Sequence, residues 1–318
     1  MTVQGDGWAG MGWNWKDHDD IRRRLDQGAD PEAWAGGRPL HRAAASGSPE
    51  AVAELARRVA DVDALHDGVT ALWEAVLARK PDNARVLAAA GADPWRQLMG
   101  GWSPGRLSLA GPTPDVFDVP AGELLTDGEE AAAEEARRLT AALGSFHYEG
   151  TGLACVADID AREAVRRLEA TQAPDELIAE MLDGLNAYRM DESLQIVGVT
   201  SVPGGCVLTQ PWGYAPQMPG VQSRLSAGTL CYGLYANAKS GNQGSIARDG
   251  AIEGWDLHPG GPPDEDDTPE EVLASYLYQC DAVAYACAFA GLRLTDARAI
   301  VGPFDLWIQL PHRDYWAH

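Results

Sequence analysis

Two stretches of the sequence place a histidine two residues from a carboxylate, the pairing that general acid–base catalysis uses. In an extended segment His147 and Glu149 would share one face, so that the carboxylate tunes the imidazole as a base. Asp256 and His258 repeat this spacing, and Trp255 beside them would form an apolar wall. Both stretches therefore predict acid–base groups, with solvated surface polarity as the alternative.

Another histidine–carboxylate stretch, Lys16-Asp17-His18-Asp19-Asp20, lies near the N-terminus. Here Asp19 or Asp20 has a second interpretation, as the cap of a following helix. Tyr214, two residues after Trp212, is a further candidate proton donor. The candidate catalytic residues are His147, Glu149, His258, Asp256 and Tyr214.

Cofactor-binding and metal-binding motifs are absent from the sequence. It contains no Gly-x-Gly-x-x-Gly after a strand, no phosphate-binding P-loop, no Gly-x-Ser-x-Gly and no His-Glu-x-x-His. The five cysteines are scattered without Cys-x-x-Cys spacing, as is typical of reduced cytosolic thiols. We therefore expect no cofactor, no metal and a cytoplasmic location.

The formal net charge of −22 limits the classes of partner. Nucleic acid requires a basic surface, and an acidic surface repels anionic membranes. No apolar run reaches the length of about 18 residues that predicts a membrane span, and the N-terminus lacks signal-peptide features. We expect neither nucleic acid nor membrane as a partner, whereas a basic protein would suit this charge.

A sequence segment recurs in the first third of the chain. Gly28-Ala29-Asp30-Pro31 returns as Val59-Ala60-Asp61-Val62 and as Gly91-Ala92-Asp93-Pro94, at offsets of 31 and 32 residues. Pro39-Leu40-His41-Arg42-Ala43 returns as Ala71-Leu72-Trp73-Glu74-Ala75. These motifs resemble the Thr-Pro-Leu-His-x-Ala signature and the period of about 33 residues of ankyrin repeats.

The ankyrin resemblance implies helix pairs separated by projecting fingers. His41 should hydrogen-bond the backbone of its own turn, and Gly28 and Gly91 should end helices in the left-handed conformation. A degraded third copy begins at Ser103-Pro104, and we expect the second half of the chain to cover that end of the stack. Second helices of the pairs are expected near 19–27, 49–59 and 81–90.

Seven of the 11 tryptophans precede residue 103. Trp73 replaces the usual histidine, and Trp34 and Trp95 follow the first and third Gly-Ala-Asp-Pro turns. The concave face of an ankyrin stack is formed by fingers and first helices, so these rings would line an apolar groove. The alternative is that they fill the core of a short, irregular array. The candidate substrate-binding residues are Trp34, Trp73, Trp95, Trp102 and Trp255.

The second half of the chain predicts strands mixed with helices, and therefore an α+β fold after the helical repeats. Helices are expected at 126–143, 160–168, 175–188 and 268–291. Strands are expected at 152–157, 194–202, 206–210, 230–236, 244–247, 251–257 and, as an edge strand, 304–310. We predict a repeat domain at 1–111, a linker with a joint helix at 112–144 and an α+β domain at 145–318.

The last long helix carries an apolar stripe in this prediction. The stripe includes Cys280 and Cys287, so both thiols should be packed as small hydrophobic groups.

The second half resembles a small α/β domain of actinobacterial proteins whose role is largely undefined. The resemblance rests on Thr151-Gly152-Leu153-Ala154-Cys155-Val156-Ala157-Asp158-Ile159-Asp160, and on Tyr235-Ala236-Asn237-Ala238 followed by Ala247-Arg248-Asp249-Gly250. Ankyrin proteins with such a second domain are similar to accessory proteins of actinobacterial polyketide pathways. That similarity implies cofactor-free ring closure. A base removes a proton α to a carbonyl, an acid helps to expel a β-hydroxyl, and a carbon nucleophile then adds to the resulting enone.

Two functions stay open on the sequence. The working hypothesis is a cyclase/dehydratase that acts on an apolar polyketide intermediate. The alternative is a non-catalytic ankyrin module, an adaptor or immunity-type protein, with a protein partner on the concave face. A closed apolar cavity of about 300 Å³ or more that contains His147 or His258 would favour the enzyme, and an open acidic face would favour the protein partner.

Overall fold

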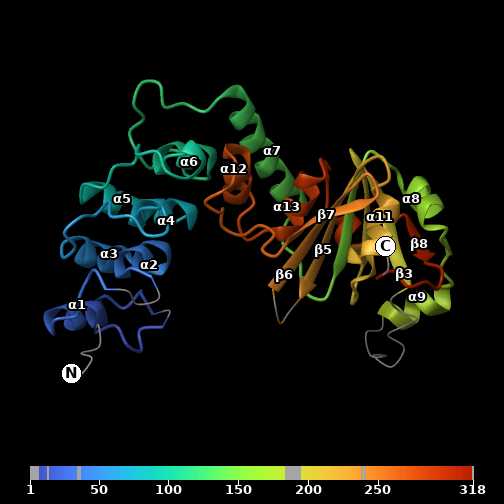
Figure 1. Cartoon of the computed structure of the whole chain (residues 1–318), viewed down its shortest axis with the longest axis horizontal. Helices are drawn as coiled ribbons and strands as arrows, with labels where there is room; N and C mark the ends of the chain where they lie inside the picture. Colours follow the sequence, from blue (N-terminus) through green and yellow to red (C-terminus); the bar gives the residue numbers. More distant parts are fainter. Residues whose placement is uncertain are drawn as a thin grey trace. The chain divides into compact units, whose positions relative to one another are not determined.

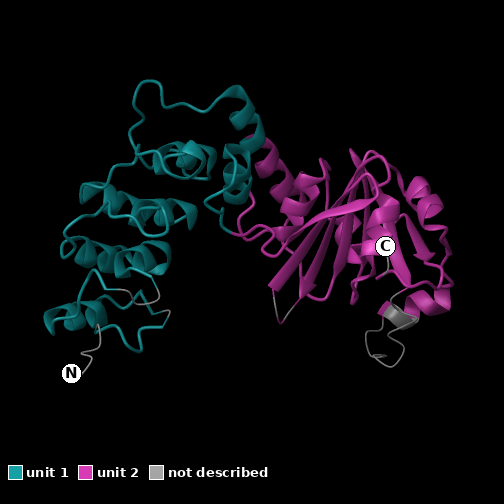
Figure 2. Cartoon of the chain, in the orientation of Figure 1, with its two compact units in different colours: residues 1–133, 262–277 teal, residues 134–261, 278–318 magenta. Residues whose placement is uncertain are grey.

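The computed structural model describes residues 7–12, 14–33, 37–182, 195–237, 239 and 241–316, apart from the side chains of 180 and 181. The chain divides into two compact units (Figure 2). The first unit comprises residues 1–133 and 262–277, and the second comprises residues 134–261 and 278–318. Residues 262–277 therefore belong to the first unit, although most of the second unit precedes them in the chain.

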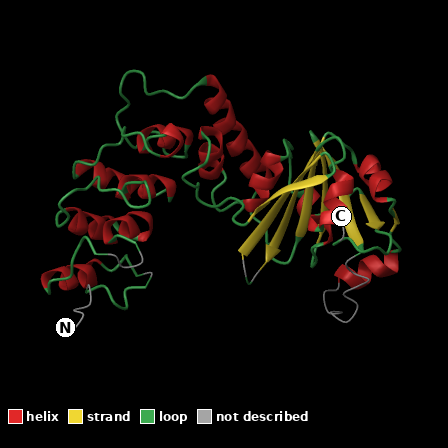
Figure 3. Ribbon diagram, in the orientation of Figure 1, coloured by secondary structure: helices red, strands yellow, loops and turns green. Residues whose placement is uncertain are grey.

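The first unit consists of helices joined by loops (Figures 1 and 3). α2 packs on α3 and α4 packs on α5, and α2 also contacts α4 in the next pair. The three predicted second helices are confirmed as α1, α3 and α5. The helices are α1 (His18–Asp26), α2 (Pro39–Ser46), α3 (Pro49–Ala56), α4 (Ala71–Leu77), α5 (Pro81–Ala89), the 3-10 helix η1 (Met99–Gly101), α6 (Pro104–Ala110), the start of α7 (Asp127–Leu143) and α12 (Pro269–Leu277).

Local sequence signals set the ends of these helices. The side chains of Ser48, Thr70 and Ser103 each accept a hydrogen bond from a backbone N–H of the first turn that follows. Gly28 and Gly91 have positive φ angles of 92° and 101°, as predicted, because glycine tolerates this conformation after a helix. Thr126 and Glu129 form the predicted reciprocal capping pair of α7.

Two further segments cover the ends of this helical core. At the N-terminal end the buried rings of Trp8 and Trp15 lie 5.6 Å apart between centroids, and the Trp8 indole donates to the Asp30 carbonyl. At the other end α12 packs on η1 and α6 (Figure 1). The indole of Trp102 donates to the carbonyl of Pro269 over 2.8 Å. A segment from the second half of the chain therefore covers the last repeat.

The described part of the second unit contains one eight-stranded sheet, in which every pair of neighbours is antiparallel. The strand order is β2-β8-β3-β4-β1-β5-β6-β7. The fold class is thus a helical repeat region followed by an α+β sheet region, as predicted. The strands are β1 (Gly152–Ala157), β2 (Thr171–Gln172), β3 (Ile196–Val202), β4 (Gly205–Gln210), β5 (Leu230–Asn237), β6 (Gly241–Arg248), β7 (Ala251–Asp256) and β8 (Leu306–Gln309).

Helices cover both faces of this sheet. Ala154 and Val156 of β1 point to the face that packs against α8 (Ala161–Leu168) and α11 (Pro219–Leu225). Cys155 points to the opposite face, where it meets α13 (Ala282–Phe289). The unit also contains α9 (Asp175–Leu182), the 3-10 helix η3 (Ala215–Gln217) and α14 (Arg298–Val301). Ala154 and Val156 face one side and Cys155 faces the other because side chains alternate along a strand with a period of two residues.

Two predicted elements differ from the structure, and a third is described only in part. The helix expected at 268–291 is two helices, α12 and α13, because Cys280 has a φ of 62° and its N–H donates to the Gly260 carbonyl. Cys280 is consequently exposed, and its prediction as a packed thiol was wrong. β8 is not an edge strand, since two-residue β2 pairs with its outer side. The helix expected at 175–188 is seen as α9, and residues 183–188 lie outside the described residues.

Candidate functional site

The fingers of the first unit share one kind of turn, in which an aspartate side chain bonds the backbone. In each finger an aspartate accepts a hydrogen bond from the N–H two residues later, at 2.9 Å: Glu32 to Asp30, Asp63 to Asp61 and Trp95 to Asp93. In such a turn one carboxylate oxygen replaces a backbone carbonyl as the acceptor, so the chain can turn without a helix or a strand pairing. Asp30, Asp61 and Asp93, which we call the finger carboxylates, are all exposed.

A second set of carboxylates joins each finger to the next. Glu32 accepts from the N–H of Ala60 at 2.8 Å. Both oxygens of Asp63 accept from the N–H of Asp93, at 3.2 and 3.0 Å. Burial raises the pKa of Asp63, and the nearby charges of Asp61 and Asp93 add to that effect. The fingers therefore form a connected, acidic series in which one set of carboxylates holds the structure and the other faces solvent.

His41 has a structural role, although not with the predicted partner. Its Nε2–H donates to the carbonyl of Val69 at 3.1 Å, in the following finger rather than in its own turn. Asp67 and Gly68 have positive φ angles of 48° and 77°, so they form a tight turn that presents Val69 to the imidazole. Burial lowers the pKa of His41 to about 4, and the imidazole is neutral at pH 7.

The first helices add one half-buried carboxylate to this surface. Glu74 lies on α4, and burial raises its pKa while the charge of Arg42 on α2 opposes that shift. The nearby His66 ring meets His41 edge-on, with centroids 5.4 Å apart. The fingers and first helices, which the sequence predicted to line an apolar groove, therefore also carry polar side chains.

The tryptophans assigned to substrate binding lie in different environments. Trp73 and Trp102 are each 1% exposed and belong to the core of the first unit. Trp95 lies against the backbone of Gly105, whose lack of a side chain makes that contact possible. Trp255 is 56% exposed on β7 in the second unit, and Trp34 lies outside the described residues. Trp73 and Trp102 thus fill the core, which was the alternative stated for such rings.

The His147 stretch lies near the end of the sheet at which β1 begins. Its Nε2 is 3.9 Å from an oxygen of Glu149, and both side chains are largely exposed, at 71% and 65%. The Gly213 N–H donates to the Gly150 carbonyl, which brings Tyr214 to the same end of the sheet. Tyr214 packs between the rings of Tyr235 and Trp316, at centroid distances of 5.7 and 5.8 Å. The structure therefore brings three candidates to one region, where water reaches the His147–Glu149 pair.

Asp256 has a partner that the sequence did not reveal. The hydroxyl of buried Tyr232, on β5, donates to Asp256 Oδ2 over 2.6 Å. Burial raises the pKa of Tyr232, and the hydrogen bond to Asp256 raises it further. The other Asp256 oxygen accepts from the backbone N–H of His258, so the contact with His258 does not involve the imidazole. Tyr232 and Asp256 lie two strands apart in the sheet. Their contact could not be predicted from their sequence separation, because it depends on the strand order.

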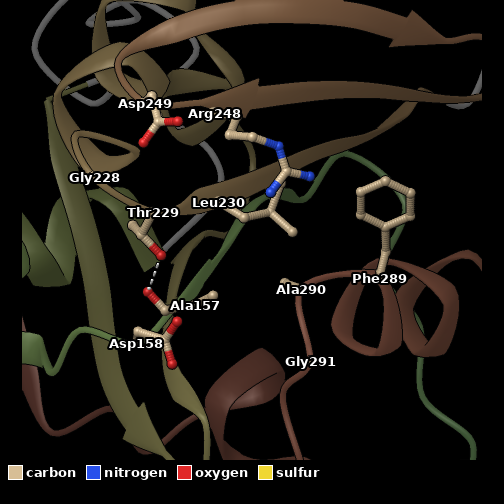
Figure 4. Close-up of a pocket in the computed structure, with 10 residues that line it drawn as sticks. All are labelled: Ala157, Asp158, Gly228, Thr229, Leu230, Arg248, Asp249, Phe289, Ala290 and Gly291. Atoms are coloured by element: carbon tan, nitrogen blue, oxygen red, sulfur yellow. Dashed lines mark hydrogen bonds between the residues drawn. The ribbon is translucent and has the colours of Figure 1, made fainter.

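A pocket of about 390 Å³ lies at the end of β5 where this strand begins, at Leu230 (Figure 4). Asp158 and Asp249 contribute carboxylates on one side, and Phe289 forms a wall on the other. Arg248 Nε donates to Glu253, at 3.2 Å. None of the predicted catalytic or substrate-binding residues lines this pocket. Its lining consists of Ala157, Asp158, Gly228, Thr229, Leu230, Arg248, Asp249, Phe289, Ala290 and Gly291.

No group of three or more His, Cys, Asp or Glu side chains in the described ranges is placed to hold a metal ion. Within the same ranges, no helix has the length and apolar character needed to cross a bilayer.

The comparisons with known proteins identify one region. Residues 13–97 match the family model for ankyrin repeats, in three copies. A comparison of the chain with curated proteins gives no match. The matched region contains the three finger carboxylates, His41 and helices α1 to α5. The N-terminal ankyrin region and its general association with protein binding are thereby supported.

Proposed function

We propose that the first unit is a protein-binding module whose finger carboxylates receive a basic segment of a partner protein. The observation that carries this proposal is that the acidic side chains of the fingers fall into two sets, one bonded within the stack and one exposed. Glu32 and Asp63 are used within the stack, whereas Asp30, Asp61 and Asp93 each keep a carboxylate exposed after making the finger turn. The exposed set recurs with the repeat and gives a row of negative charge.

Charge complementarity supports a basic partner over an acidic or neutral one. The whole chain carries a formal charge of −22, which would steer a cationic partner and repel an anionic one. Exposed charge pairs contribute modestly to affinity and are screened by salt. A binding mode of this kind should therefore weaken as the ionic strength rises.

The cyclase/dehydratase hypothesis gains no support from the described residues. The 390 Å³ pocket contains neither His147 nor His258. Trp73 and Trp102 are buried in the core, and the His147–Glu149 pair is exposed to water. Acid–base chemistry on an apolar substrate needs a site that excludes water.

Native affinity capture tests the proposed function. The full chain would be immobilised and exposed to a lysate of its native cells, and retained proteins and small molecules would be identified by mass spectrometry. We expect a basic protein at a stoichiometric level. The matched bait is the triple variant Asp30→Asn, Asp61→Asn and Asp93→Asn, because asparagine keeps an acceptor oxygen for each finger turn while removing the charge.

The two baits separate the outcomes. A basic protein retained by the wild-type chain and depleted on the triple variant supports the proposal. A retained lipophilic metabolite without any protein would contradict it and return attention to catalysis. Equal retention of the protein by both baits would show that the finger carboxylates are not the binding surface.

A further inference from the structure

Two thiols in the second unit lie next to each other although 132 positions separate them in the chain. Cys155 Sγ, on β1, is 3.8 Å from Cys287 Sγ, on α13. Both side chains are fully buried, at 0% exposure. β1 is held on both sides, by β4 and by β5, so Cys155 lies on a fixed strand inside the sheet.

The other cysteines lie apart from this pair. Cys206 and Cys231 belong to the core on the α8 and α11 face of the sheet, together with Ala154 and Val156. Cys155 points to the opposite face, since side chains alternate along a strand. Cys280 is exposed, in the segment before α13. The geometry therefore singles out one pairing among the five thiols.

We propose that Cys155 and Cys287 form a reversible disulfide that fastens α13 to the central strand β1 when the protein meets a peroxide. One thiol attacks the peroxide and becomes a sulfenic acid with release of water, and the second thiol displaces a second water as the S–S bond forms. The two thiols together lose two protons and two electrons, and hydrogen peroxide accepts both. The sulfur atoms must approach by about 1.8 Å to reach a bond length of about 2.05 Å.

The position of α13 shows what such a bond would control. Residues with positive φ flank the helix at both ends, Cys280 at 62° and Gly291 at 70°. The C-terminal end of the helix supplies Phe289, and the next two residues supply Ala290 and Gly291, to the 390 Å³ pocket (Figure 4). A covalent link at Cys287, two residues before Phe289, would fix one wall of that pocket.

Burial also sets how the reaction proceeds. The contact with Cys287 and burial raise the pKa of Cys155, so little reactive thiolate is present while the two thiols are buried. We therefore expect slow oxidation that follows transient opening of α13. Once formed, the bond should be reduced slowly for the same reason, because a reductant must also reach a buried sulfur.

Thiol mapping of the full chain tests the proposal. The chain with Cys280→Ser, which removes the exposed thiol and with it links between chains, would be treated with hydrogen peroxide and then denatured in N-ethylmaleimide. Peptide mass spectrometry should find Cys155 joined to Cys287, with Cys206 and Cys231 alkylated. The oxidised protein should also melt at a temperature at least several degrees higher, since the link closes a long loop.

Matched variants show whether the pairing is specific. Cys206→Ser and Cys231→Ser remove buried thiols on the other face and should leave the cross-link in place, whereas Cys287→Ser should abolish it together with the rise in melting temperature. Recovery of Cys155 and Cys287 as free thiols in the peroxide-treated protein would overturn the proposal. A cross-link that joins either residue to Cys206 or Cys231 instead would overturn it equally, and this mapping does not depend on the folding of any cysteine variant of the pair.

Discussion

The two units of the chain are organised by different ranges of sequence. In the first unit most of the stack is local: Asp30, Asp61 and Asp93 make the same turn in successive fingers, and each pair of helices contacts the next. In the second unit the strand that follows β1 in the chain is β2, yet β1 lies between β4 and β5. A repeat unit can therefore be located from spacing, whereas the sheet depends on pairings that spacing does not encode.

The largest expected effect separates buried from exposed tryptophan. Trp73→Ala should lower the free energy of unfolding of the first unit by about 3–5 kcal/mol, because a fully packed ring is replaced by a cavity. Urea unfolding followed by circular dichroism measures the change. Trp255→Ala, at a 56% exposed position of the second unit, is the control and should change stability by about 0.5 kcal/mol or less. Equal effects of the two substitutions would contradict the assignment of Trp73 to the core.

The next effect is a pH dependence that arises in the first unit. The pKa of His41 is about 4 in the folded state and about 6.5 in the unfolded chain, so the unfolded state binds more protons between these values. The stability due to neutral His41 is complete above pH 6.5 and is lost as the pH falls towards 4. The difference corresponds to about 3 kcal/mol. Urea unfolding at pH 7 and pH 4 should show this loss in the wild-type chain and a smaller loss in His41→Ala; parallel losses would refute the role of His41.

The link between fingers should have a smaller effect. Asp63→Ala removes both oxygens that accept from the Asp93 N–H and should cost about 1–2 kcal/mol in the free energy of unfolding. Asp63→Asn retains an acceptor and should cost less. Asp115→Ala, at an exposed residue between α6 and α7, is the control for loss of one negative charge. If the Asp115 and Asp63 alanine variants unfold at the same urea concentration, the link between fingers does not stabilise the stack.

The smallest effect concerns α12, the segment that the first unit takes from the second half of the chain. Thr268 accepts from the Glu271 N–H at 3.3 Å, and its own N–H donates to the Glu271 side chain at 2.8 Å. Thr268→Ala should therefore lower the melting temperature of the first unit by the equivalent of about 1 kcal/mol. Glu270→Ala, two residues away and exposed, should have a smaller effect. No difference between these variants would show that the cap of α12 does not contribute to the stack.

The helical repeats were predictable because their signals are local. The glycines at 28 and 91 and the proline-led helix starts mark the ends of helices within a few residues. The partner of His41 was not predictable in the same way, because Val69 belongs to the next finger and reaches the imidazole only after the stack forms. The same reason applies to α12, whose place on α6 depends on contacts far apart in the sequence.

The strands of the second unit were predictable in position, but their neighbours were not. The hydroxyl of Tyr232 on β5 reaches Asp256 on β7 only because these two strands flank β6. Cys155 on β1 meets Cys287 because α13 packs on that face of the sheet. Residue type also left the candidate groove open to two interpretations, since an apolar ring favours a core as much as a binding surface. The location of His147 at an exposed end of the sheet required the structure for the same reason.

The most direct measurement of the central claim is the affinity of the captured basic protein for two forms of the full chain. Calorimetric titration would compare the wild type with the variant Asp30→Asn, Asp61→Asn and Asp93→Asn, at about 0.05 M and about 0.5 M salt. We expect the wild type to bind at least about tenfold more tightly at low salt, with most of that advantage lost at high salt. Equal affinities at low salt would contradict the claim that the finger carboxylates form the binding surface.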